Sequence, residues 1–248
     1  MEWSDEGIVI ATRPHGETSA VCELFTKHHG RHLGLVRGGR SKRMRPICQI
    51  GNVVSATWRA RLDEHLGHFT LELEDPIASR FFDEPMTLAG LGTLCSHLNL
   101  FAERDSHQGL YEGAKLLLSH LEEKDIWPGL LVRFELEVLT ELGVGLDLST
   151  CAATGNSSDL IYVSPKSGRA VSSQAGAPYK DKLLALPAFL LEESQVISSA
   201  DLTNGFALTG YFFEKHFWSN NQDHGQITTQ PQARQQFLNL FHRFAGEE

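Results

Sequence analysis

Apolar and polar side chains alternate with a period of two through much of the first 75 residues, which is the spacing of half-buried β-strands. The longest alternating stretch is NVVSATWRARL, residues 52–62, which places on one face Val54, Ala56, Trp58, Ala60 and Leu62. Further strands are predicted at 7–13, 19–26, 32–37 and 68–74, the last with Phe69, Leu71 and Leu73 pointing inward. Five short strands so close together predict a small closed barrel.

Beyond Pro76 the apolar positions follow helical spacing. Helices are predicted near 88–101, 110–121, 128–142, 202–217 and 231–244. Glu135, Glu137 and Glu141 are expected on the solvated face of the third helix. A loop-rich insert is expected at about 146–187, with a short hairpin around Pro165–Gly168. The chain is therefore predicted to be an α+β protein, with a barrel domain at 1–78 and a mainly helical domain at 79–248.

Charge is distributed unevenly along this chain, whose formal net charge is −9. No acidic residue falls between Glu23 and Asp63, although that span holds nine Lys or Arg. The basic segment, residues 37–45, contains GGRSKR, where glycines let a loop approach a charged backbone closely. Closely spaced guanidinium groups can neutralise nucleic-acid phosphates, so the candidate contacts are Arg37, Arg40, Lys42, Arg43, Arg45, Arg59 and Arg61.

A plainer interpretation of these cations stays open. The basic segment can be an ordinary solvated loop, and Arg59 and Arg61 can pair across a hairpin with Thr70, Glu72 or Glu74. Trp58 lies on the apolar side of its strand, so we expect it in the core and not as a platform for bases. An overall pI near 5.7 means that any polyanion site must be local.

Several classes of protein are not supported by the motifs. The chain has no Walker loop, no Rossmann fingerprint, no nucleophile elbow and no HExxH, and its basic region lacks the carboxylates that a metal-dependent nuclease needs. We therefore predict no enzyme, no catalytic residue and no cofactor. Residues 1–17 show no basic leader followed by an apolar run, so we expect no secretory signal, and no apolar run reaches the roughly 20 residues that span a bilayer. A cytoplasmic protein without a membrane partner is expected.

Three segments carry a specific resemblance when they are taken in order. ATRPHGETSAVCELFTKHHGR, LVRGGRSKRMRP and VRFELEVLTELGVGLDLSTC together resemble the bacterial recombination mediator family RecO, from near Gly7 to about Leu191. The resemblance implies an N-terminal OB-fold and a helical domain. It also implies binding to single- and double-stranded DNA, annealing of complementary strands, and association with the nucleoid. The implied protein partners are the single-strand-binding protein SSB, RecR and, indirectly, RecA.

The resemblance also bears on two single residues. Some family members carry a four-cysteine zinc module in the insert, but this sequence keeps only Cys151 of that pattern, so no metal is expected. Arg133 stands at the arginine of the family's RFEL segment, which implies a grip on the acidic, aromatic-ended tail of SSB. An apolar pocket for that tail is expected between the helices that carry Phe134 and Phe213. The alternative role for Arg133 is a surface ion pair.

Two other functions are weighed against this one. An RNA-binding OB module of translation or ribosome assembly would show exposed aromatic side chains on the barrel, which the strand phases do not offer. A hydrolytic repair enzyme would need a metal-binding carboxylate cluster within the basic region, which has none.

Overall fold

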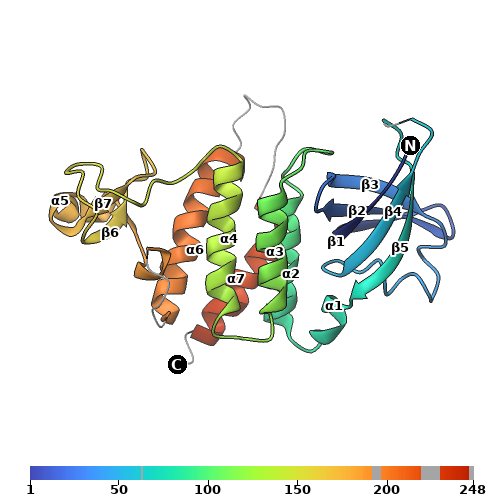
Figure 1. The fold of residues 1–248 in the computed structure, drawn as a ribbon. Coiled ribbons are helices and arrows are strands. Elements are labelled where there is room, and N and C mark those ends of the chain that lie inside the picture. Colours follow the sequence, from blue (N-terminus) through green and yellow to red (C-terminus); the bar gives the residue numbers. More distant parts are fainter. Residues whose placement is uncertain (63, 192–196, 219–229, 246–248) are drawn as a thin grey trace. The chain divides into compact units, whose positions relative to one another are not determined.

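The computed structural model describes residues 1–62, 64–191, 197–218 and 230–245 (Figure 1). The chain forms two compact units, each described by itself. The first contains Met1–Ser119 and Pro231–Phe241, and the second contains His120–Gln230 and His242–Glu248. We keep the predicted domain boundary near residue 78, within the short helix Ile77–Arg80 that follows the fifth strand, as a proposal. Among the described helices, none is long and apolar enough to cross a membrane.

Five strands form a closed barrel in the first unit, in the order β1-β2-β3-β5-β4. Their bounds are Glu2–His15 (β1), Ser19–Thr26 (β2), Gly30–Val36 (β3), Val53–Arg59 (β4) and His68–Asp75 (β5). All neighbours are antiparallel except β3 and β5. The predicted five-stranded OB-fold barrel is therefore confirmed, and β1 begins five residues earlier than expected.

The barrel interior confirms most of the predicted core. Trp58 is fully buried, and it packs with Val54, Ala56, Phe69 and Leu71. The prediction is wrong for two residues, which are exposed and are not part of the buried core. Leu62 is 47% exposed because β4 ends at Arg59. Leu73 is 37% exposed, although it lies opposite Val54 in the same register as Phe69 and Leu71, next to the bulge near the end of β5.

The barrel closes where β3 meets β5. These strands pair in parallel through Leu35 and His68, and the Leu35 N–H donates to the Gly67 carbonyl at 3.0 Å. The close approach depends on Gly34, because a Cβ at that position would lie 2.4 Å from the Phe69 ring. The closure therefore sets the end of β3 beside the start of β5.

Helices complete the first unit: α1 (Ile77–Arg80), α2 (Pro85–Leu98), α3 (Gln108–Ser119) and α7 (Gln232–Ala245), the last as far as Phe241. Three polar contacts hold α3 to the barrel. Tyr111 donates to Glu6 at 2.5 Å, Lys115 pairs with Glu6 at 3.2 Å, and Lys27 pairs with Glu112 at 2.6 Å. Burial and the neighbouring Glu6 carboxylate raise the pKa of Tyr111, so its hydroxyl remains a donor. The predicted helices near 88–101 and 110–121 are confirmed within a few residues.

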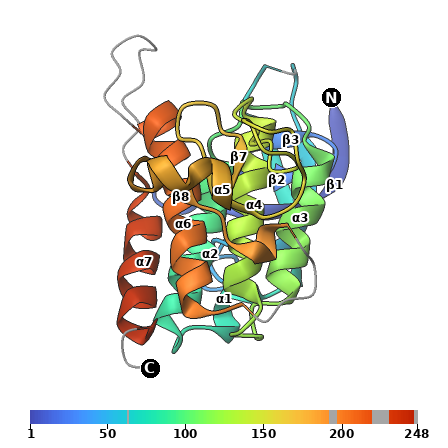
Figure 2. The same cartoon turned by 90° about the vertical axis from the view of Figure 1, so that its left-hand side faces the viewer.

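Two helices lie side by side in the second unit, α4 (Trp127–Glu141) and α6 (Ser199–Phe213), as Figures 1 and 2 show. A capping box made by Ser198 and Asp201 starts α6, and a π-helical turn, η3 (Glu214–Trp218), continues it. Glu135 is fully buried and accepts a hydrogen bond from Thr209 of α6. Its predicted solvated position is wrong, because α6 covers this side of α4.

The insert contains more regular structure than a loop-rich segment. The predicted hairpin is confirmed, and a third short strand joins it in the order β7-β6-β8. The elements are β6 (Leu160–Val163), β7 (Ala170–Ser172), α5 (Ser173–Gly176), η1 (Ala177–Lys182), β8 (Leu184–Ala185) and η2 (Ala188–Leu190).

Candidate nucleic-acid interface

The basic segment lies in the connection between β3 and β4, and backbone hydrogen bonds give it a defined path. Gly38 has a φ of 65°, which allows the turn after β3, and its carbonyl accepts from the Ser41 N–H at 2.8 Å. The Arg45 N–H then donates to the Ser41 carbonyl at 2.9 Å. Farther on, the Asn52 amide donates to the Pro46 carbonyl at 2.8 Å. The cations of this segment therefore project from an ordered loop.

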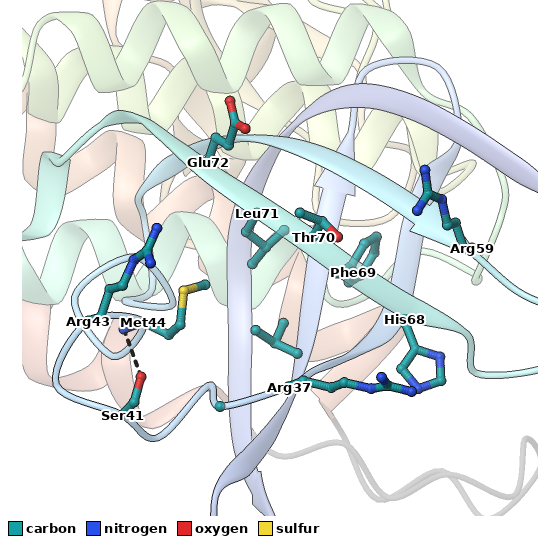
Figure 3. A pocket seen from close by; sticks show the side chains of 12 residues that line it. Arg37, Ser41, Arg43, Met44, Arg59, His68, Phe69, Thr70, Leu71 and Glu72 are labelled. Atoms are coloured by element: carbon teal, nitrogen blue, oxygen red, sulfur yellow. Dashed lines mark hydrogen bonds between the residues drawn. The ribbon is translucent and has the colours of Figure 1, made fainter.

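A groove of about 710 Å³ lies between this loop and strand β5, and Arg59 at the end of β4 also lines it (Figure 3). Its lining combines cations with apolar side chains. The lining residues are Val36, Arg37, Gly38, Ser41, Arg43, Met44, Arg59, His68, Phe69, Thr70, Leu71 and Glu72.

The structure separates the seven predicted cations into three sets. Arg37, Arg43 and Arg59 line the groove together. Arg40 instead donates to the carbonyls of Gly16 and Glu17, each at 2.9 Å, which ties the loop to the β1–β2 turn. The remaining three are exposed but do not line the groove: Lys42, Arg45 and Arg61.

Arg59 has a partner that the sequence did not predict. Its Nη2 donates to Glu2 Oε1 at 2.7 Å, because Glu2 of β1 stands opposite Arg59 in the ladder. This hydrogen bond lowers the pKa of the Glu2 carboxyl and raises the pKa of Arg59, so both stay charged at neutral pH. Arg59 therefore pairs with Glu2 of β1 and not with a residue of the β4–β5 hairpin. A phosphate would have to share or displace this contact.

Other groove residues lie outside the cationic pattern that the sequence revealed. His68 opens β5 beside the closure of the barrel, and Met44 comes from the basic segment itself. Phe69 and Leu71 line the groove from the barrel side, although each side chain is at least 95% buried. A signal for Met44 was present, since it is an apolar residue inside a run of cations. The position of His68 required knowledge of the barrel closure.

Arg133 is half-buried on α4 in the second unit, and its Nη2 donates to the backbone carbonyl of Phe189. Phe134 and Phe213, whose helices are expected to flank the pocket for the SSB tail, are both buried. The pocket between these helices stays a prediction. The role of Arg133 toward a partner stays a proposal.

Cys151 is buried in the insert and is engaged by β7. Its Sγ accepts from the Ser172 N–H at 3.3 Å and lies 3.4 Å from the Ser172 hydroxyl. Within the described ranges, no group of three or more His, Cys, Asp or Glu is placed to hold a metal ion. The residues present therefore do not fit a four-cysteine zinc site.

We expect purified protein to contain no stoichiometric zinc, because one cysteine cannot complete a tetrahedral site. A chelator should accordingly leave the melting temperature unchanged, since no metal-binding free energy contributes to folding. Elemental analysis and a thermal melt with and without chelator check this prediction. One bound zinc per chain would contradict this interpretation of the insert.

Comparison with known proteins adds two family matches. The model described as "Recombination protein O N terminal" matches residues 1–76, and "Recombination protein O C terminal" matches 87–220. Similar full-length proteins are named DNA repair protein RecO. That of Mesorhizobium japonicum is 53% identical, covering 96% of this chain and 92% of its own length. That of Methylobacterium nodulans is 52% identical, covering 99% of this chain and 100% of its own length. That of Brucella abortus is 50% identical, covering 98% of this chain and 97% of its own length.

Proposed function

The chain belongs to the recombination protein O (RecO) family of DNA repair proteins, and on this premise we propose that it acts as a recombination mediator. In this role it binds single- and double-stranded DNA, anneals complementary strands, and helps RecA load on SSB-coated single strands together with RecR. It works on the nucleoid. The observation that carries the proposal is the groove of the barrel, whose lining includes Arg37, Arg43 and Arg59 on its different sides.

The groove chemistry supports annealing without catalysis. Guanidinium groups neutralise phosphates and release counterions, so they weaken the repulsion between two strands. Base pairing then supplies both the driving force and the specificity, and no catalytic residue is needed. A hydrolytic enzyme is less well supported, because Glu72 is the one carboxylate among the residues that line the groove. Membership of a DNA repair family likewise favours DNA over the RNA of a translation module.

Arg133 is our candidate for the contact with SSB. A guanidinium can take a terminal carboxylate in a bidentate, charge-assisted pair. In the structure Arg133 already donates to the Phe189 carbonyl, which orients its side chain from η2. The acidic tail of SSB would add a carboxylate to this arrangement.

A strand-annealing assay tests the proposed function. Complementary labelled oligonucleotides, bare or coated with SSB, are mixed with and without the protein at fixed salt. We expect the protein to accelerate duplex formation in both cases, because it neutralises phosphates on both strands. Non-complementary oligonucleotides serve as the control and should form no duplex. Equal rates with and without the protein, for bare and coated strands alike, would refute the proposal.

A further inference from the structure

The groove has an apolar side that phosphate contacts do not use. Phe69 and Leu71 are 4% and 5% exposed, so the barrel presents only part of each side chain to the groove. Met44 faces them from the basic segment and packs, half-buried, against the same barrel core. In Figure 3 the Met44 thioether extends from the loop toward the strand that carries Leu71. Cations therefore flank a small apolar surface, to which Met44 is the most exposed contributor of the three.

The backbone of Met44 is fixed, so its side chain reaches the groove from a defined point. The Met44 N–H donates to Ser41 Oγ at 3.2 Å. Its carbonyl accepts from the N–H groups of Ile47 and Cys48, at 3.0 and 3.1 Å. Arg43, the preceding residue, lines the same groove. An apolar contact and a cationic contact thus come from adjacent positions of one ordered turn.

We propose that Met44, with the exposed edges of Phe69 and Leu71, receives an unpaired nucleobase while the groove arginines hold the adjoining phosphates. This inference rests on the proposed function and specifies whether the groove prefers single-stranded or duplex DNA. A thioether is polarizable and makes favourable contacts with aromatic rings. A base in a duplex is stacked and paired, so it must leave the helix to reach Met44. The groove therefore favours single strands over duplexes.

The test compares four variants by equilibrium titration over a range of salt concentrations, with an oligothymidylate and with a hairpin duplex of equal phosphate number. Met44→Ala and Met44→Gln should each lose roughly two- to tenfold in affinity for the single strand, from the usual strength of sulfur–aromatic contacts. Met44→Leu keeps the apolar volume and should lose less. Duplex affinity should not change for any of them, and neither should the salt slope, because every cation remains.

Ile47→Ala is the matched control, because Ile47 also packs against the barrel core but does not line the groove. It should bind both ligands like the unchanged protein. Equal losses on single strand and duplex, or an Ile47→Ala loss as large as that of Met44→Ala, would overturn the proposal, because Met44 would then act by holding the loop. Unchanged single-strand affinity in Met44→Ala would also overturn it. Failure of the unchanged protein to bind either ligand would refute the proposed function itself, which is a separate outcome.

Discussion

Replacing Arg37, Arg43 and Arg59 together by Ala should lower affinity for single-stranded DNA roughly 25- to 100-fold at about 0.1 M salt. Each phosphate contact on a single strand contributes about 0.7 to the slope of log affinity against log salt. The slope should therefore become shallower by about 1.4 if the ion pair with Glu2 keeps Arg59 out of contact, and by about 2 if all three residues bind phosphates. Fluorescence anisotropy of a labelled oligonucleotide at several salt concentrations measures both quantities.

The chain offers a charge-matched control for this experiment. Lys42, Arg45 and Arg61 are also exposed cations from the predicted set, but they do not line the groove. Replacing these three by Ala removes the same charge, and we expect a smaller change in slope than in the groove variant. Equal changes in both triple variants would mean that DNA responds to the overall cationic surface and not to the groove. A groove variant with an unchanged slope would move the DNA site elsewhere.

Arg133→Ala should weaken binding of an SSB tail peptide by about 2 kcal/mol or more, which is roughly thirtyfold in affinity. A buried hot-spot contact has this size, whereas a surface ion pair contributes far less. Annealing of SSB-coated strands should slow in proportion. Annealing of bare strands should change little, because that reaction depends on the cations of the barrel. Titration of labelled peptide at fixed salt provides the primary measurement.

Two further variants distinguish geometry from charge at Arg133. Arg133→Lys keeps the positive charge but loses the planar fork, so peptide affinity should fall between those of the unchanged protein and Arg133→Ala. Lys182→Ala removes an exposed cation from η1 of the same unit and should leave affinity unchanged. Equal peptide affinity in Arg133→Ala and the unchanged protein would return Arg133 to a role within the fold, as the donor to the Phe189 carbonyl.

The strands could be predicted because a half-buried sheet imposes a period of two that local sequence reveals. This period predicts that Trp58 lies in the core, and it is fully buried. The pairing of Arg59 with Glu2 could not be predicted in this way. Glu2 belongs to a mostly polar segment, residues 2–6, and this segment becomes part of β1 by pairing with the whole length of β4. Strand pairing of this kind is a property of the folded barrel.

The burial and hydrogen-bond partners of single charged residues could not be predicted from the local sequence either. Glu135 neighbours Phe134 on a helix, and only the position of α6 decides that a carboxylate is buried there with Thr209 as donor. Arg40 looks like its neighbours in the sequence, but the fold brings the carbonyls of Gly16 and Glu17 within its reach. The sequence therefore predicts where the cations cluster. Tertiary contacts determine which cations line the groove, which one holds the loop to the β1–β2 turn, and which lie outside the groove.

The closure of the barrel couples ligand binding in the groove to the local parting of β3 and β5. The ladder pairs β3 and β5 through Leu35 and His68, and Arg37 and Phe69 line the groove just beyond these residues. A ligand that contacts residues of both strands binds only while the strands are paired, so at free concentration L it raises the free energy of parting them by RT ln(1 + L/Kd). If the groove binds DNA as proposed, hydrogen exchange at the Leu35 amide should slow as the bound fraction rises.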